Sequence, residues 1–344
     1  MNPDNPGLQG VRVLLGVTGS IAAYKAAEWV RALVKEEAVV TVMMTKSASQ
    51  FVSSLTFAAL SGNRVYHDMF ETDPDGVMAH ITLSRDHDVV LLAPATAQTI
   101  ARLGHGVADD LISTVCLASN KPVVVCPAMN TNMYMHRATQ MNIGQLKTYG
   151  YHIVDPDSGE LACGEVGDGR LPDWDIAREA LLRVLSPQDL EGQKLLITAG
   201  PTREAIDPVR YVTNRSSGKM GYALARAARR RGAQVTLISG PVSLPAPAGV
   251  HRVMVQSAAD MEREVMAHLP AASAVIKSAA VADYRPKDVK EHKIKKTEGP
   301  LSLEFTENND ILALVGHKRR SHQVIVGFAA ESKHHVQEGQ RKLH

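Results

Sequence analysis

The sequence has little cysteine, almost no net charge and no long apolar run. Its three cysteines, Cys116, Cys126 and Cys163, are too few for a disulfide framework and lack the paired spacing of metal ligands. The 38 basic and 36 acidic residues leave a formal charge of +2, so no strong field favours nucleic acid or an anionic membrane. No run approaches the roughly 20 apolar residues that span a bilayer, and the N-terminal MNPDNPGLQG does not resemble a signal peptide. We therefore expect a cytoplasmic protein whose partners are small molecules.

Short apolar runs alternate with amphipathic stretches along both halves of the chain. In the first half we expect strands at 11–17, 39–44, 88–93 and 123–126, and helices at 21–35, 47–60, 96–103, 109–118, 132–149 and 175–185. In the second half we expect strands at 194–198, 234–239, 250–255, 274–278 and 323–328, and helices at 218–231 and 258–268. This alternation predicts α/β domains with parallel, doubly wound sheets, whose ligands bind at the carboxyl ends of the strands.

A polar stretch at 185–192 separates the two halves, and a length of 344 residues favours two domains. We place the first domain at residues 1–188 and the second at 189–344.

Hydroxyl-bearing turns follow three strands of the first half. They are Thr18-Gly19-Ser20, Thr45-Lys46-Ser47 and the turn ending at Thr96. Amides at helix N-termini suit a phosphate, and three such turns should meet at one sheet edge. Since the first turn lacks the third glycine of GxGxxG, the mononucleotide FMN fits better than NAD. The alternative for each hydroxyl is an ordinary helix N-cap.

Asn130 and Cys163 indicate carboxylate chemistry beside a cofactor. Asn130 follows the strand at 123–126, and its amide can donate to a carboxylate, which His80 could orient as a cation. A lone histidine is more often a surface or core residue. Cys163 lies in a glycine-rich stretch, 157–170, that we expect to be a mobile surface loop delivering an acid or thiol to a substrate. Cys116 and Cys126 lie in apolar runs and should be core residues.

The second half contains a candidate phosphate site. Residues 214–221 open a helix but do not form a Walker A loop, because Thr213 and Met220 replace required residues. Asp283 is followed by a run of lysines at 287, 290, 293, 295 and 296, which could serve a triphosphate and its Mg²⁺. The alternative is a solvated basic face.

Together these residues resemble a known family. Residues 18–20, 80, 93–96, 127–133 and 162–164 resemble the flavin-dependent cysteine decarboxylases. With 279–283, 293–296, 309–311 and 326–331 included, nearly the whole chain resembles the bacterial bifunctional phosphopantothenoylcysteine decarboxylase/phosphopantothenate-cysteine ligases of coenzyme A synthesis.

The resemblance implies a fold and two reactions. It implies a flavodoxin/Rossmann-like FMN domain with three α/β/α layers and a flexible flap, followed by a Rossmann-like nucleotide-binding α/β domain. In the ligase reaction CTP, with Mg²⁺, activates 4′-phosphopantothenate as an acyl-cytidylate, and the cysteine amine displaces CMP. In the decarboxylase reaction the cysteinyl thiol end is oxidised to a thioaldehyde-like species, and its carboxylate leaves as carbon dioxide to give 4′-phosphopantetheine.

The resemblance also assigns residues. In the decarboxylase site, Asn130 holds the substrate carboxylate, His80 acts as base or orienting cation and Cys163 donates a proton. The FMN contacts would be Thr18, Gly19, Ser20, Thr45, Ser47, Thr96, Ala97, Gln98, Thr99 and Ala128. The CTP contacts would be Ala279, Asp283, Lys293, Asn309, Asp310, Ile311, Leu312, Phe328 and Lys342, with Arg210 and Asn214 facing the acyl intermediate. The Mg²⁺ ligands are unknown.

The resemblance further implies a homo-oligomer, with trimers of the flavin domain that are often stacked into dodecamers. The family continues past Lys342, so we expect the chain to be truncated at its C-terminus, and Asn309 stands where the family usually has proline. Three alternatives stay open: a decarboxylase with an inactive truncated ligase domain, a flavin-binding regulatory protein without catalysis, and an NAD(P) oxidoreductase. The missing GxGxxG opposes the last of these.

Overall fold

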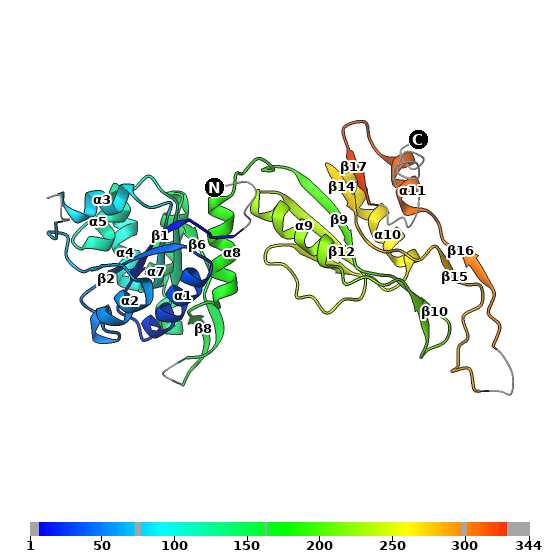
Figure 1. Cartoon of the computed structure of the whole chain (residues 1–344), viewed down its shortest axis with the longest axis horizontal. Coiled ribbons are helices and arrows are strands. Elements are labelled where there is room, and N and C mark those ends of the chain that lie inside the picture. The colour runs from blue at the N-terminus through cyan, green and yellow to red at the C-terminus, as the bar shows by residue number, and fades with distance from the viewer. Residues whose placement is uncertain (1–6, 73–76, 162–163, 297–300, 329–344) are drawn as a thin grey trace. The chain divides into compact units, whose positions relative to one another are not determined.

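The computed structural model describes residues 7–72, 77–161, 164–296 and 301–328. The chain divides into two units, Met1–Ser186 and Pro187–His344, and each is described by itself (Figure 1). Among the described residues, no helix combines the length and the apolar content needed to cross a membrane.

Unit 1 is a parallel six-stranded sheet with helices on both faces. Its strand order is β3-β2-β1-β4-β5-β6. The strands are β1 (Arg12–Val17), β2 (Val39–Met44), β3 (Val65–Tyr66), β4 (Val89–Ala95), β5 (Val123–Pro127) and β6 (His152–Ile153). The helices are α1 (Ala23–Lys35), the 3₁₀ turn η1 (Ala48–Gln50), α2 (Ser54–Ser61), α3 (Ala79–Arg85), α4 (Ala97–His105), α5 (Leu111–Ala118), α6 (Thr131–Met135), α7 (Arg137–Thr148) and α8 (Trp174–Leu185).

Two hydrophobic cores cover the opposite faces of this sheet. Because side chains alternate along a strand, Leu15 of β1 packs with Trp29 of α1 and Leu181 of α8 in one core. Leu14 packs in the other core with residues of α3, α4, α5 and α7, including Ile100. The expected three-layer α/β/α fold is therefore confirmed. Cys116 and Cys126 are buried, as expected.

Unit 2 is also a parallel sheet between helices. Its strand order is β13-β12-β9-β14-β17. The strands are β9 (Lys194–Ala199), β12 (Gln234–Ser239), β13 (His251–Met254), β14 (Ala274–Lys277) and β17 (Val324–Gly327), and the helices are α9 (Lys219–Arg230), α10 (Ala258–His268), the 3₁₀ turn η2 (Leu269–Ala271) and α11 (Ile311–Lys318). The side chain of Tyr222 from α9 lies in one core, and those of Met261 from α10 and Ile311 from α11 lie in the other.

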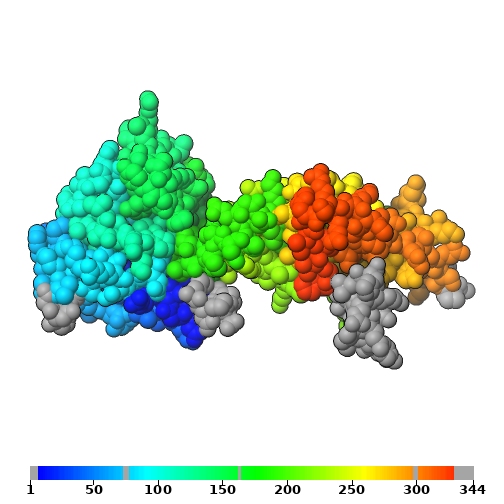
Figure 2. All heavy atoms as spheres, turned by 90° about the horizontal axis from the view of Figure 1, so that it is seen from above, coloured from blue at the N-terminus to red at the C-terminus, as the bar shows by residue number. Residues whose placement is uncertain are grey.

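Two antiparallel ribbons extend from the carboxyl edge of the second sheet. One pairs β10 (Arg203–Ala205) with β11 (Tyr211–Thr213), and the other pairs β15 (Tyr284–Pro286) with β16 (Phe305–Glu307). The space-filling view places the orange atoms of the second ribbon at one end of unit 2 (Figure 2). The sequence pattern predicted neither ribbon, since each strand has only three residues.

Four local expectations were wrong. The helix expected at 47–60 is two elements, because Ser53 is extended and caps α2 by accepting a hydrogen bond from the backbone of Leu55. The helix expected at 132–149 is interrupted at His136, which caps α7. His80, for which no element was expected, lies in α3. Within 157–170, the described residues form an antiparallel hairpin of β7 (Asp157–Glu160) and β8 (Val166–Arg170) instead of a loop.

Candidate functional site

The crevice of unit 1 lies where the strand order reverses, between β1 and β4. In a doubly wound sheet the connections from these two strands leave toward opposite faces, which opens a crevice at their carboxyl ends. Thr18 follows β1 and Thr96 follows β4, so two of the three expected turns flank this crevice.

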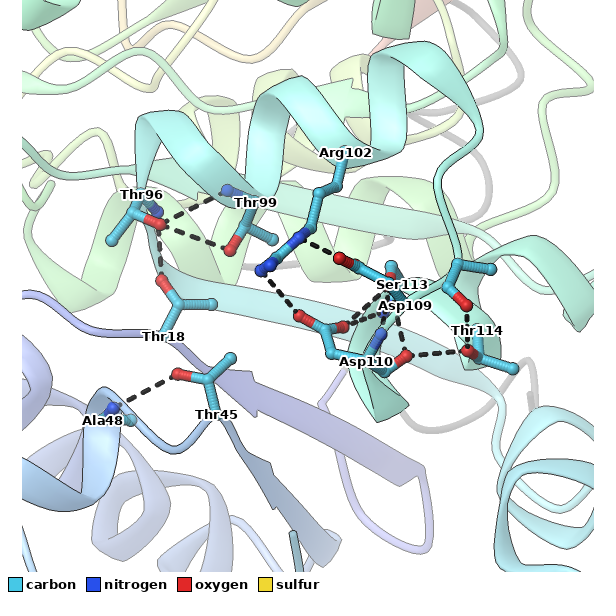
Figure 3. Close-up of polar contacts among 11 residues, drawn as sticks. Thr18, Thr45, Ala48, Thr96, Thr99, Arg102, Asp109, Asp110, Ser113 and Thr114 are labelled. Atoms are coloured by element: carbon cyan, nitrogen blue, oxygen red, sulfur yellow. Dashed lines mark hydrogen bonds and ion pairs between the residues drawn. The ribbon is translucent and has the colours of Figure 1, made fainter. Parts of the chain in front are cut away.

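Thr18 joins these two turns through its side chain. Its Oγ1 donates to the Pro94 carbonyl at 2.7 Å. It also accepts from the Thr96 N–H at 3.0 Å, a bond that Figure 3 shows. The side chain is buried, with 1% of the residue exposed. The hydroxyl of Thr18 therefore shapes the crevice by fixing one turn against the other.

The turn after β2 touches the turn after β1. A Cβ added to Gly19 would lie 2.4 Å from the Cβ of Ser47, so only glycine allows this approach. Thr45 holds its own turn in place, since its hydroxyl accepts a hydrogen bond from the Ala48 N–H at 3.1 Å. Ser20 is half-buried and Ser47 is exposed at this edge. The predicted convergence of three hydroxyl-bearing turns is confirmed.

Helix α4 begins at the same edge. Thr96 is its N-cap, and its hydroxyl accepts from the Thr99 N–H at 3.4 Å and lies 3.2 Å from the Thr99 hydroxyl. Thr96 is therefore a helix N-cap, and its contact with FMN stays a prediction. Ala97 and Gln98 form the first turn of α4, whose N-terminus favours an anion.

Arg102 anchors the chain that follows α4. Its guanidinium binds Asp109 at 2.8 Å and Asp110 at 3.0 Å, as Figure 3 shows. Asp110 in turn caps α5 by accepting from the Ser113 N–H at 2.8 Å. The sequence analysis overlooked this network, although the Asp-x-x-Ser spacing is typical of a helix cap.

Asn130 presents its amide NH₂ group to a carboxylate. Its Oδ1 caps α6 by accepting from the Asn132 N–H at 2.8 Å, and its Nδ2 donates to Glu165 Oε2 at 2.6 Å. Since the oxygen is used by the local helix, the NH₂ group is the part of this amide that faces outward. Ala128 ties the same turn to β4, because its N–H donates to the Ala95 carbonyl at 3.0 Å.

Strand β8 packs directly on the turn that carries Asn130. A Cβ on Gly169 would lie 2.2 Å from the Met129 carbonyl oxygen, and one on Gly167 would lie 2.6 Å from Thr131 Oγ1. Gly169 also has a φ of +141°, which few other residues adopt. Glycine is therefore needed twice to bring the hairpin, and with it Glu165, against Asn130.

Of the two remaining candidates of this site, the structure describes only His80. His80 is half-buried in α3, and its Nδ1 lies 3.3 Å from the Met69 carbonyl. Cys163 lies outside the described residues.

The strand order of unit 2 also reverses, between β9 and β14, and this opens a second crevice at the carboxyl ends of these strands. Thr198 Oγ1 accepts from the Ala279 N–H at 3.2 Å, and Thr202 Oγ1 accepts from the Ala282 N–H at 3.0 Å. A Cβ on Gly221 of α9 would lie 2.5 Å from the Ala199 Cβ, so this helix starts against the crevice.

Most of the candidate CTP residues surround this crevice. Asn214 donates to the Val281 carbonyl at 2.9 Å, and the Asp283 carbonyl accepts from the Asn308 N–H at 2.8 Å. Asp310 caps α11 and lies 3.9 Å from Lys277 Nζ. The structure thus brings together segments from three parts of the sequence.

The other candidates of unit 2 differ in accessibility. Asn309 donates to Glu262 at 3.0 Å, and Leu312 packs beside Gly327. Ile311 is only 1% exposed and packs in the core, whereas Phe328 is 51% exposed. Lys342 lies outside the described residues.

Arg210 and the exposed Lys293 belong to neighbouring segments, since Arg210 donates to the Ile294 carbonyl at 3.1 Å. The described residues contain no group of three or more histidine, cysteine, aspartate or glutamate side chains arranged to hold a metal ion.

Two family models match the chain. The flavoprotein model matches residues 2–185, and the model for the C-terminal domain of DNA/pantothenate metabolism flavoproteins matches residues 190–344. Curated relatives carry the name coenzyme A biosynthesis bifunctional protein CoaBC. Those of Vibrio parahaemolyticus and Escherichia coli K12 are both 48% identical over 94% of this chain, and cover 82% and 81% of the relative, respectively.

Solved structures resemble each half of the chain. A phosphopantothenoylcysteine (PPC) decarboxylase mutant with bound pantothenoylaminoethenethiol is 27% identical over 50% of this chain and 97% of its own, with a TM-score of 0.46. The C-terminal domain of a CoaBC protein is 47% identical over 46% of this chain and 74% of its own, with a TM-score of 0.41.

Proposed function

The chain belongs to the bifunctional coenzyme A biosynthesis flavoproteins, and from that premise we propose which of its residues carry each activity. It is an enzyme with a decarboxylase activity and a ligase activity. The observation that carries the assignment of residues is the hydrogen bond from the Asn130 amide to a carboxylate within the decarboxylase half.

FMN is proposed to bind in the crevice of unit 1. The residues there fit a phosphorylated flavin, because the Gly19 turn lies against Ser47 and helix α4 begins at the same edge. When bound, the flavin supplies a two-electron acceptor for the cysteinyl end of the substrate. The proposed contacts are Thr18, Gly19, Ser20, Thr45, Ser47, Thr96, Ala97, Gln98, Thr99 and Ala128, with Thr18 acting by holding the turns together.

Asn130 is proposed to hold the substrate carboxylate during decarboxylation. Its NH₂ group already donates to Glu165 at 2.6 Å, so its orientation suits a carboxylate acceptor. His80, half-buried in α3, would act as base or orienting cation. Cys163 would return a proton to the ene-thiol product.

The crevice of unit 2 is proposed to bind CTP and the acyl intermediate. Arg210 and Asn214 would contact the intermediate, and Ala279, Asp283, Lys293, Asn309, Asp310, Ile311, Leu312, Phe328 and Lys342 would contact CTP. Mg²⁺ is proposed to arrive with CTP, because Mg²⁺ is usually held through substrate phosphates.

Two parallel incubations separate the two activities. The purified chain would receive 4′-phosphopantothenate, cysteine, CTP and Mg²⁺, and in a second vessel 4′-phosphopantothenoylcysteine alone. Pyrophosphate in the first reports the ligase, and carbon dioxide with 4′-phosphopantetheine in the second reports the decarboxylase. Carbon dioxide without pyrophosphate would mean an inactive ligase half, and a flavin spectrum without either product would mean a binding protein.

Two broader properties complete the proposal. As an enzyme that joins and trims small metabolites, the chain is proposed to act in the cytoplasm as a homo-oligomer, with trimers of the flavin unit. Light scattering of the FMN-loaded protein would test the oligomer, since a monomeric mass would contradict it.

A further inference from the structure

Asp207 is a buried carboxylate at the tip of the β10–β11 ribbon. Its side chain is fully buried, with 0% exposed, although the ribbon around it is open to solvent. A buried charge is costly unless hydrogen bonds or an opposite charge compensate it. The sequence offered no signal for this residue, because it lies in the stretch 199–217, between two expected elements and without a periodic pattern.

The two oxygens of Asp207 serve different parts of the chain. Oδ1 accepts from the Val209 and Arg210 N–H groups, both at 2.8 Å, and so shapes the turn of its own ribbon. Oδ2 accepts from the Ile294 N–H at 3.1 Å and lies 3.6 Å from the Arg210 guanidinium. Burial acts to raise the pKa of Asp207, but the three N–H donors and Arg210 outweigh it and lower that pKa.

Two further bonds join the same pair of segments. The Lys290 N–H donates to the Ile206 carbonyl at 3.0 Å, and the Arg210 guanidinium donates to the Ile294 carbonyl at 3.1 Å. Residues 290–294 therefore lie along the ribbon tip, and Figure 1 shows this segment following β15. The exposed Lys293 lies between Lys290 and Ile294, whose backbone groups are both hydrogen-bonded to the ribbon.

We propose that Asp207 is a positioning residue of the ligase site, which fixes Arg210 and the Lys293 segment relative to each other. This inference rests on the proposed function, in which Arg210 faces the acyl intermediate and Lys293 contacts CTP. Asp207 positions Arg210 in two ways. Oδ1 fixes the turn by accepting from the Arg210 N–H, and the charge of Oδ2 attracts the Arg210 guanidinium. Without Oδ2 as an acceptor, the Ile294 N–H would lose its partner, and only the Lys290 and Arg210 hydrogen bonds would hold the Lys293 segment to the ribbon.

The substitution Asp207→Asn tests the tether with little change in shape. The remaining side-chain oxygen can still accept from Val209 and Arg210, whereas the new NH₂ group would face the Ile294 N–H donor. Ile294→Pro removes the same bond from the other side, because proline has no N–H. The control is Asp189→Asn, an exposed carboxylate of the same unit that pairs with Arg231.

The FMN-loaded chain, with both units present, is compared in three assays. With either tether variant, the ligase kcat/KM for CTP should fall roughly tenfold or more, since a hydrogen bond to a charged group is lost, while decarboxylation of supplied substrate stays within twofold. Trypsin should cut after Lys290 or Lys295 about tenfold faster, and the bond after Lys293 is not used because trypsin does not cleave before the proline of Ile294→Pro. In the double variant the two losses should not add, because both remove one interaction.

The outcomes separate the inference from the proposed function. If the wild type forms pyrophosphate but both tether variants match Asp189→Asn in kcat/KM and in proteolysis, Asp207 does not position this site. If only the melting temperature falls, with kcat/KM and proteolysis unchanged at a lower assay temperature, Asp207 is a stability residue and the inference fails. If the wild type forms no pyrophosphate, the proposed ligase function fails, and unchanged proteolysis would overturn the tether as well.

Discussion

Replacing Gly19 by alanine should weaken the binding of FMN to unit 1. The added Cβ would lie 2.4 Å from the Ser47 Cβ, and 3.3 and 3.4 Å from the Ser47 backbone. An ordinary contact begins at 3.4 Å, so the two turns would have to separate by about 1 Å. None of these three Ser47 atoms is the end of a flexible side chain, and therefore the turns themselves must move.

The size of the effect follows from the cost of overpacking. Forcing an extra methyl group into a closed contact costs about 1–3 kcal/mol, and a site whose walls must move loses that much binding free energy. FMN affinity should therefore fall roughly 5- to 150-fold. The loss should be larger than the change in unfolding free energy, because the contact lies between two ligand-facing turns and not in the core.

Flavin absorbance relative to protein absorbance gives the loading after purification, and flavin fluorescence during titration of the apoprotein gives the dissociation constant. Gly144→Ala is the matched control, because an added Cβ in α7 would meet no atom within 4 Å. That change should leave FMN affinity unaltered and stabilise the helix by up to about 1 kcal/mol. Wild-type FMN affinity in Gly19→Ala would refute the placement of the cofactor beside this contact.

Asn130→Asp should lower carbon dioxide release about 100-fold or more, because two carboxylates would face each other at the position of the 2.6 Å bond to Glu165. Undiminished release with normal FMN loading would contradict the role of Asn130. Thr18→Val should lower the unfolding free energy of unit 1 by about 1–3 kcal/mol, because it leaves the Thr96 N–H without its acceptor and removes one of the two donors to the Pro94 carbonyl. Urea unfolding followed by flavin fluorescence measures this loss, and Thr18→Ser should recover most of it. Burial raises the pKa of Cys116 to about 12 and raises that of Cys126 further. Both thiols therefore stay protonated at pH 8 and should resist iodoacetamide. If peptide mass spectrometry finds label on either thiol without denaturant, the core opens.

The turns at the two sheet edges were the most predictable part of the candidate sites. A hydroxyl after a buried strand is visible in the sequence, and in a parallel sheet the carboxyl ends of neighbouring strands meet at one edge. What each hydroxyl does was not predictable. Thr18 and Ser20 are two residues apart, yet the Thr18 hydroxyl is buried between β1 and β4, whereas Ser20 is partly accessible.

The hairpin β7–β8 shows where sequence reasoning failed. Its strands are short and rich in glycine and charge, so no apolar alternation revealed them. The glycines that suggested a loop are instead required by close packing, since Gly167 and Gly169 lie against the turn around Asn130. A glycine's role depends on which atoms come near it, and those atoms belong to a distant segment.

The order of residues alone was sufficient for the α/β class, the division into two halves, the family and the meeting of hydroxyl-bearing turns at one sheet edge, because these depend on periodicity and on local motifs. Folding in three dimensions determined which groups meet across long separations. Asn130 faces Glu165, and Asp207 holds Ile294 although 87 positions separate them. Hydrogen-bond partners of this kind are selected by packing geometry, and no periodic pattern in the chain encodes them.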